Sequence, residues 1–134
     1  EIIDQLKRTN DVIDATLGVT PKWFAPPSGS FTDTVVEEAA NQNMHTILWS
    51  VDTIDWRKPQ PQEMVQRVLS KVHPGATILM HPTDSSARGL EQLIIGLKEK
   101  GYEIGTVSDL LAETRTQFPK PTDKSRGSEI DTEN

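Results

Sequence analysis

The sequence predicts an α/β protein in which short parallel strands alternate with amphipathic helices. Residues 46–51 (TILWSV) and 76–80 (ATILM) are short apolar runs rich in β-branched side chains, and each run leads into a polar turn. Between these runs, apolar residues recur at spacings of three and four, which is the pattern of a helix with one buried face. Strands that alternate with helices in this way favour parallel βαβ units.

The N-terminal part is expected to form a helix, a strand and a second helix. The first helix ends at Gly18, which is suited to a left-handed cap, and its apolar stripe consists of Ile2, Leu6, Ile13 and Leu17. Residues 22–25 (KWFA) follow as a short buried strand. Ser30 is suited to cap the next helix, whose apolar face consists of Phe31, Val35, Val36, Ala39 and Ala40.

The rest of the chain is expected to continue this alternation. After the strand at 46–51, an amphipathic helix is predicted from Met64, Val65, Val68, Leu69 and Val72. The strand at 76–80 follows a His-Pro-Gly turn, and the helix after it, which ends at residues 100–102, is predicted from Leu90, Leu93, Ile94 and Leu97. Residues 102–105 (YEIG) are expected to form a last short strand, and residues 106–113 (TVSDLLAE) a short capped helix.

Composition limits the classes of function. A formal net charge of −6 argues against binding to a nucleic-acid backbone, and the absence of cysteine excludes disulfides and thiolate chemistry. No apolar run approaches the roughly 18 residues that a membrane-spanning helix needs. The first ten residues are too charged for a signal peptide, so the chain is expected to be cytosolic or already processed. Residues 1–115 are assigned to one folded domain, and residues 116–134, with prolines and mixed charge, are predicted to be a flexible tail.

Three strand ends carry the residues that could perform chemistry. In parallel α/β proteins, function collects at the carboxyl ends of the strands. Here those ends are residues 26–29 (PPSG), 52–56 (DTIDW) and 81–83 (HPT). Together they offer two carboxylates, an imidazole, an aromatic ring and a turn with free backbone N–H groups, which are the parts of a general acid–base hydrolase with an oxyanion hole.

Each of these parts also has a purely structural interpretation. His81 could be a half-buried histidine bonded to a backbone carbonyl, and Asp52 and Asp55 could be turn residues that bond their own backbone. If one of the two aspartates reaches His81, it would fix the ring tautomer and favour a role as proton donor. A tryptophan at the rim, Trp56, could pack or bind a sugar ring.

The proline turn has the same two interpretations. Pro26 and Pro27 could simply stiffen a connector, or they could hold the backbone N–H of Ser28 in place for a ligand. The other histidines, His45 and His73, are not spaced for joint metal binding with each other or with His81, so this segment is expected to contain no metal site.

The order of three motifs resembles a known family. FAPPSG (24–29), DTIDW (52–56) and ILMH (78–81) resemble the third, fourth and fifth motifs of the polysaccharide deacetylases, which form the NodB-homology domain or carbohydrate esterase family 4. The resemblance runs from about Ile2 to Leu111 and is strongest to the peptidoglycan deacetylase-like proteins of spore-forming Bacillus species. It implies the C-terminal half of a distorted, incomplete (β/α) barrel.

The resemblance also implies an activity, the hydrolytic N-deacetylation of N-acetylated glycans such as peptidoglycan or chitooligosaccharides, and a role for each residue. His81 would be the general acid, oriented by Asp55 or, as the weaker choice, by Asp52. The backbone N–H of Ser28 would stabilise the oxyanion. The substrate-binding residues would be Pro26, Pro27, Asp52, Trp56 and Leu79, with Leu79 facing the acetyl methyl group and Trp56 forming a wall of the groove.

Two departures from the family pattern matter. Ala25 stands where the family usually has an arginine that holds the catalytic aspartate, and Ser28 stands in place of a tyrosine. The first two motifs, which supply the base and the ligands of a divalent metal, often zinc, are absent from this sequence. An N-terminal fragment of the same domain is therefore the expected partner, and an extracytoplasmic location in the cell wall or at the membrane, through a segment outside this chain, is implied.

Two alternatives to an active enzyme follow from the sequence. The loss of arginine at Ala25 is consistent with a catalytically impaired domain that binds glycan or a protein partner. A sugar-binding or small-molecule domain of an unrelated α/β type would require the three motifs to coincide by chance.

Overall fold

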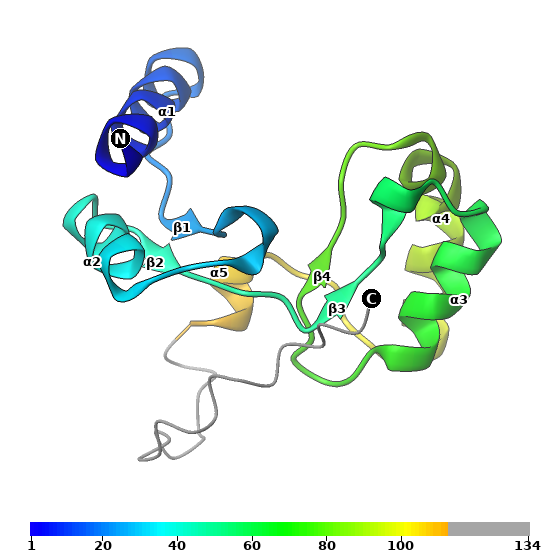
Figure 1. Ribbon diagram of the computed structural model, residues 1–134. Coiled ribbons are helices and arrows are strands. Elements are labelled where there is room, and N and C mark those ends of the chain that lie inside the picture. The colour runs from blue at the N-terminus through cyan, green and yellow to red at the C-terminus, as the bar shows by residue number, and fades with distance from the viewer. Residues whose placement is uncertain (113–134) are drawn as a thin grey trace. The chain divides into compact units, whose positions relative to one another are not determined.

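The computed structural model describes residues 1–112, which fall into two compact units (Figure 1). The first unit is Glu1–Leu48, and the second begins at Trp49. Each unit contains one pair of short parallel strands. Each pair is joined through a helix, so both units repeat the βαβ arrangement that the sequence predicts.

The first unit combines two helices with the first strand pair. Its elements are α1 (Ile2–Leu17), β1 (Trp23–Phe24), the 3₁₀ turn η1 (Pro27–Gly29), α2 (Asp33–Asn41) and β2 (His45–Thr46). Gly18 ends α1 in the left-handed conformation, φ 65°, as predicted. The strands β1 and β2 pair in the register Trp23 to His45 and Phe24 to Thr46.

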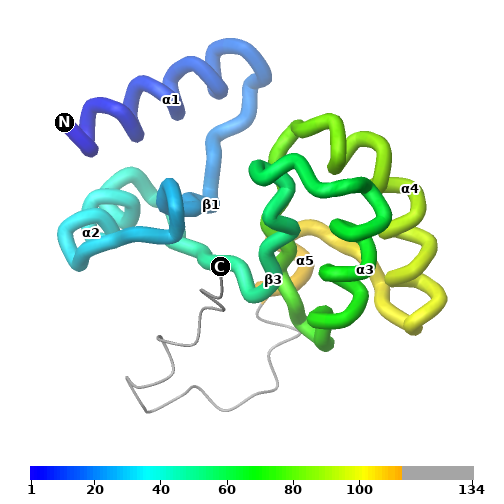
Figure 2. The backbone as a smooth tube through the Cα atoms, turned by 45° about the vertical axis from the view of Figure 1, so that its right-hand side comes forward, coloured from blue at the N-terminus to red at the C-terminus, as the bar shows by residue number. Residues whose placement is uncertain are grey.

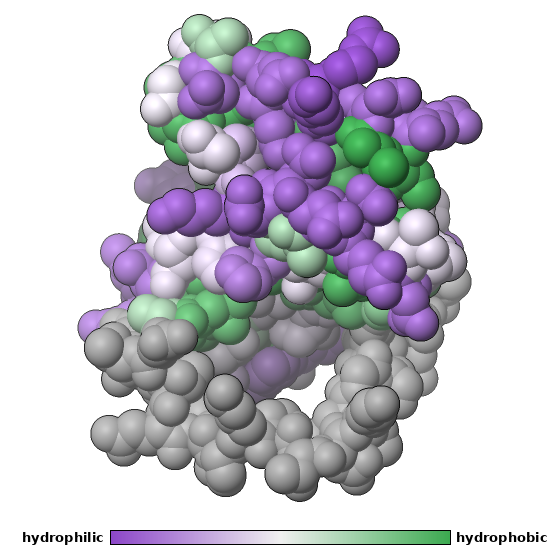
Figure 3. Space-filling view, turned by 90° about the vertical axis from the view of Figure 1, so that its left-hand side faces the viewer, coloured by the Kyte–Doolittle hydropathy of each residue, from purple (hydrophilic) through white to green (hydrophobic). Residues whose placement is uncertain are grey.

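The outer helix of this unit is only partly covered. No residue of α1 is buried among the described residues, and Val12 and Leu17 are 63% and 70% exposed. Figure 3, which faces the side of the first unit, shows hydrophobic side chains interspersed with hydrophilic ones. The apolar side chains of α1 are therefore only partly covered by the other residues of 1–112.

The second unit has a larger core. Its elements are β3 (Val51–Asp52), the 3₁₀ turn η2 (Asp55–Arg57), α3 (Pro61–Lys71), β4 (Ile78–Leu79), α4 (Asp84–Glu99) and α5 (Val107–Leu110). The helices α3 and α4 lie side by side in Figures 1 and 2. The buried core residues come from both helices and from β3, and they are Val51, Met64, Val65, Val68, Leu93 and Leu97. This core fixes the strand pair β3–β4, in which Asp52 lies opposite Leu79.

Three predictions of local structure are wrong. Residues 46–51 do not form one strand, because β2 ends at Thr46 and β3 begins at Val51. Thr32, not Ser30, caps α2, since its side chain accepts a hydrogen bond from the N–H of Val35. Residues 102–105 form no strand, because neither strand pair of the described residues includes them.

The remaining predicted helices and strands are present, and three of them, β1, β4 and α5, are shorter than predicted. The strand predicted at 76–80 is reduced to β4, and the short helix predicted at 106–113 to α5, which Thr106 caps through a reciprocal pair of hydrogen bonds with Asp109. The predicted tail at 116–134 lies outside the described residues. No helix of the described part is long and apolar enough to cross a membrane.

Candidate functional site

The second unit brings two of the predicted strand ends together around one carboxylate. Asp55 follows β3, and His81 follows β4, so the parallel pairing of these strands places both residues at the same edge. The Nδ1 atom of His81 lies 2.8 Å from Oδ1 of Asp55, and the backbone N–H of His81 donates to Oδ2 at 2.6 Å. The aspartate thus holds both the ring and the backbone of the histidine.

The buried and exposed sides of this pair differ sharply. The side chain of Asp55 is 0% exposed, whereas that of His81 is 47% exposed. An ionised carboxylate can only accept hydrogen bonds, so the proton between the two groups lies on Nδ1 of His81. Within residues 1–112 Nε2 of His81 has no hydrogen-bond partner, and this atom is available to exchange a proton with a substrate.

Two hydroxyl groups complete the environment of Asp55. Ser86 Oγ donates to Oδ2 at 2.6 Å, and Thr83 Oγ1 donates to the same oxygen at 3.4 Å. Both residues belong to the start of α4, whose partial positive charge also favours a carboxylate. Sequence reasoning missed Ser86, although hydroxyl residues at the cap and third position of the helix after His81 were a usable signal.

Burial alone would raise the pKa of Asp55, because it removes water from the charged form. The hydrogen bond from Ser86 and the bonds and positive charge of His81 outweigh burial and lower the pKa to about 2 from the ordinary value of 3.8. Asp55 is therefore charged at neutral pH although its side chain has no exposed surface.

The turn that carries Asp55 is built from unusual backbone. Ile54 and Lys58, on either side of η2, both have left-handed conformations, with φ of 52° and 56°. A β-branched residue such as Ile54 rarely adopts this conformation, and the Oδ1 atom of Asp52 supports it by accepting the N–H of Ile54 at 2.8 Å. The result is that Asp55 points inward while its neighbour Trp56 remains 54% exposed.

The two aspartates of this turn consequently have different environments. Asp55 contacts His81, whereas Asp52 bonds the backbone of its own turn and, through its carbonyl, accepts from Nε of Arg67 at 2.9 Å. Leu79 lies opposite Asp52 in the strand pair and is half-buried. Arg57 stacks on the exposed ring of Trp56 at 4.7 Å, a cation–π contact that holds the ring at the surface.

The proline turn belongs to the first unit and is described by itself. Pro26 is buried and Pro27 is exposed, and the N–H of Gly29 donates to the carbonyl of Pro26 at 3.0 Å. Ser28 has a left-handed backbone, φ 59°, and its N–H donates no hydrogen bond to any described residue. The turn therefore presents one free N–H from a rigid frame, which is what an anion-stabilising group requires.

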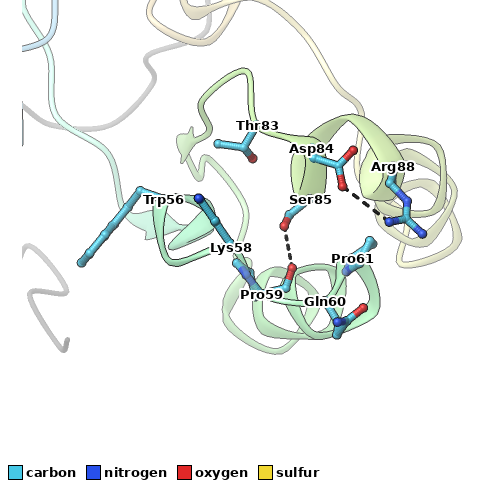
Figure 4. A pocket seen from close by; sticks show the side chains of 9 residues that line it. All are labelled: Trp56, Lys58, Pro59, Gln60, Pro61, Thr83, Asp84, Ser85 and Arg88. Atoms are coloured by element: carbon cyan, nitrogen blue, oxygen red, sulfur yellow. Dashed lines mark hydrogen bonds and ion pairs between the residues drawn. The ribbon is translucent and has the colours of Figure 1, made fainter.

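A separate pocket of about 460 Å³ lies where α3 and α4 begin (Figure 4). It is lined by Trp56, Lys58, Pro59, Gln60, Pro61, Thr83, Asp84, Ser85 and Arg88. Neither Asp55 nor His81 is part of the lining, and the ring of Trp56 points away from the other side chains in Figure 4. Asp55 and His81, the pair that we call the dyad, are therefore not part of the pocket lining. The pocket lies beside them, since Trp56 and Thr83 are close to them in the chain.

The described residues do not fit a metal ion by themselves. Within residues 1–112, no three His, Cys, Asp or Glu side chains lie close enough together to bind one. His45 is engaged in a ring contact with Trp23, and Nδ1 of His73 lies 3.0 Å from the carbonyl of Pro74.

Comparisons with known proteins identify the family of this chain. The sequence model of the family named polysaccharide deacetylase matches residues 1–47. The crystal structure of BA3943, described as a CE4 family pseudoenzyme from Bacillus anthracis, is 52% identical with a TM-score of 0.82, over 84% of this chain and 40% of that one. The chain belongs to the polysaccharide deacetylase family. Its fold is thus part of the NodB-type α/β fold, as predicted.

Other proteins are similar to this chain over nearly the same length. The protein YlxY of Bacillus subtilis (strain 168) is 58% identical over 85% of this chain and 36% of its own length. PdaC of the same organism, a peptidoglycan-N-acetylmuramic acid deacetylase, is 33% identical over 82% of this chain and 23% of its own length. The chain therefore spans less than half the length of these relatives and represents part of a deacetylase domain.

Proposed function

We propose that this chain supplies the leaving-group side of a hydrolytic N-deacetylase site that acts on N-acetylated glycans, with peptidoglycan as the preferred class. The observation that carries the proposal is the dyad, in which a buried, charged Asp55 bonds Nδ1 of His81 and leaves Nε2 exposed. A histidine held in this way is a general acid aimed at solvent.

In the proposed reaction, water adds to the acetyl carbonyl and the C–N bond of the acetamide then breaks. The departing amine takes the proton from Nε2 of His81, and the charge of Asp55 stabilises the protonated ring before this transfer. The exposed ring of Trp56, which lies in the same unit as His81, is assigned to one wall of the groove. Acetate and a free amino sugar leave.

Residues 1–112 offer no cluster that fits the divalent metal of the family, so no step is assigned to a metal here. Activation of the attacking water is assigned to groups outside this chain, in the N-terminal part of the domain. That part is also the proposed partner of the incompletely covered helix α1. The peptidoglycan substrate places the protein outside the cytoplasm.

A second candidate function is glycan binding without turnover. Two observations favour it, namely Ala25 in place of the family arginine and the 52% identity to a protein described as a pseudoenzyme. The dyad could remain in such a protein as part of a binding surface.

The two candidates differ in one measurement on the complete protein. Acetate release from an N-acetylated chitooligosaccharide and from peptidoglycan is followed together with calorimetric binding of the same chitooligosaccharide. Binding with acetate release supports the deacetylase. If the protein binds the chitooligosaccharide but releases no acetate with any of the divalent metals added, the result contradicts the proposed deacetylase activity and supports the second candidate.

A further inference from the structure

Ser86 differs from its neighbour in what its hydroxyl group does. Both Ser85 and Ser86 lie in the first turn of α4 and are buried, at 6% and 3% exposure. Ser85 Oγ donates to the backbone carbonyl of Pro59 at 2.5 Å, which ties α4 to the start of α3. Ser86 Oγ instead donates to Oδ2 of Asp55 at 2.6 Å. Two adjacent serines therefore perform separate tasks.

Ser86 is itself held in place by the cap of its helix. Its backbone N–H donates to Oγ1 of Thr83 at 3.2 Å, and the same Thr83 oxygen lies 3.4 Å from Asp55. The cap, the third residue of α4 and the carboxylate thus form one connected network. Because the helix is 16 residues long, it is a rigid support for a hydroxyl group that must stay in one position.

A role as nucleophile does not fit Ser86. The hydroxyl group is almost completely buried, and its proton is directed at a carboxylate that accepts it, whereas a nucleophilic serine needs an exposed oxygen and a neighbouring base with a free lone pair. The exposed member of the network is His81, not Ser86.

We propose that Ser86 is a positioning residue: its hydrogen bond holds Asp55 ionised and in one orientation, and Asp55 in turn fixes the imidazole of His81 that faces the substrate. Only the last step, the protonation of a departing amine, rests on the proposed function. The effect on Asp55 and His81 follows from the contacts themselves. A hydrogen bond to a buried charged group is among the stronger ones in proteins, so its loss shifts the balance toward the neutral form of Asp55.

No lysine or arginine of the described residues bonds Asp55, so its charge is stabilised by hydroxyl groups and by His81. The charged side chains nearest to Asp55 in the sequence and on the surrounding elements have other contacts: Asp52 with the N–H of Ile54, Arg57 with the ring of Trp56, Arg67 with the carbonyl of Asp52, Glu63 with the N–H of Gln60, and Asp84 with Arg88, while Lys58 lines the separate pocket. His81 is thus the one titratable side chain that contacts Asp55 within residues 1–112. Removing Ser86 Oγ therefore removes a donor that no described cation replaces.

The test compares Ser86→Ala with Ser85→Ala in the complete protein. Carbon-13 NMR of the Asp55 carboxyl group gives its pKa, and nitrogen-15 NMR of the His81 ring reports whether Nδ1 remains hydrogen-bonded. We expect Ser86→Ala to raise the pKa of Asp55 by about one unit or more and to weaken the Nδ1 signal of the bonded form. Ser85→Ala should leave both readouts as in the parent protein, because its hydroxyl group bonds the carbonyl of Pro59.

A second variant keeps the test decisive if Ser86→Ala folds poorly. Ser86→Cys retains a weaker donor of similar shape and should give a smaller increase in the pKa of Asp55. Equal Asp55 titrations in the parent protein and both Ser86 variants would overturn the proposal.

If no form of the protein releases acetate, the proposed function fails, while these titrations still decide the role of Ser86. If the protein is active, a lower kcat with unchanged KM in Ser86→Ala supports positioning, and a change in KM alone contradicts it.

Discussion

A single buried carboxylate, that of Asp55, links the stability of this protein to its candidate chemistry. Its pKa is lowered to about 2, so folding favours the charged form over the neutral one. The stabilisation is complete above the unfolded-state pKa of 3.8 and is lost as the pH falls through that value toward about 2. A difference of this size corresponds to about 2 kcal/mol.

The first prediction concerns this pH dependence. The free energy of unfolding, measured by urea denaturation, should fall by about 2 kcal/mol more in the parent protein than in Asp55→Asn between pH 5 and pH 2. The variant serves as the reference because its amide does not titrate. Parallel pH profiles for the two proteins would show that Asp55 is not preferentially charged in the folded state.

The second prediction concerns the histidine that Asp55 orients. In a complete protein that is active, His81→Ala should reduce kcat by roughly 100-fold or more and leave glycan binding nearly intact, because the ring acts on the leaving group. His73→Ala is the matched control, since His73 is exposed and lies 3.0 Å from a backbone carbonyl of its own turn. An unchanged kcat in His81→Ala would remove His81 from the acid step.

Among the elements, the contact between α3 and α4 depends on glycine. A Cβ atom on Gly89 would lie 2.7 Å from the terminal methyl group of Met64 and 3.2 Å from the carbonyl oxygen of Pro61. The methyl group can move, but the carbonyl belongs to the first turn of α3 and cannot move without the helix. The close approach of the two helices at this point sets where the start of α4, and with it Ser86, lies relative to Asp55.

The third prediction tests this packing. Gly89→Ala gains about 1 kcal/mol of helix propensity, while overpacking costs about 1–3 kcal/mol, so the free energy of unfolding should fall by about 1 kcal/mol. The measurement is urea denaturation, with Gln92→Ala on the exposed side of α4 as the control. Stabilisation by Gly89→Ala would mean that α4 can shift away from α3 without loss.

Helices were easier to predict than strands for a physical reason. The stripe that ends at Gly18 and the alternation at Met64 and Val68 specify a helix, because both the period and the ends are encoded locally. Residues 46–51 are apolar or small throughout, so they show no period that reveals where a strand begins. Pairing with Ile78, a residue far along the chain, decides that β3 starts at Val51.

The candidate site was also predictable only in part, since the sequence identified Asp55 and His81 but not Ser86. The sequence places Asp55 and His81 at neighbouring strand ends, and the structure brings them together. Neither position nor composition distinguishes Asp55 from Asp52 with certainty, because the choice depends on the left-handed backbone at Ile54. Ser86 lies beyond the motif of His81, and its role follows only from the direction in which α4 leaves that strand.

For the whole molecule, the division into two units separates two questions about activity. The contacts among Asp55, His81 and Ser86 lie within the second unit, and Ala25 belongs to the first. Under the proposed function, we therefore attribute an effect of Ala25 to the groups that activate water, with which the family pattern associates this position, rather than to the acid. Under the same proposal, a protein with an intact acid and an impaired base is expected to bind glycan and turn it over slowly or not at all.

The fourth prediction tests that separation with Ala25→Arg in the complete protein. Ala25 is exposed and immediately precedes the buried Pro26, so a long side chain can be accommodated without disturbing a core residue. A guanidinium group at this position is expected, from the family pattern, to favour the charged form of the catalytic aspartate, and under the proposed function acetate release from a chitooligosaccharide should rise at least about 10-fold. Ala25→Gln has a long polar side chain without charge and should give no such increase. If acetate release increases in both variants, the length of the side chain and not its charge is responsible. If it increases in neither, a group other than this arginine limits turnover.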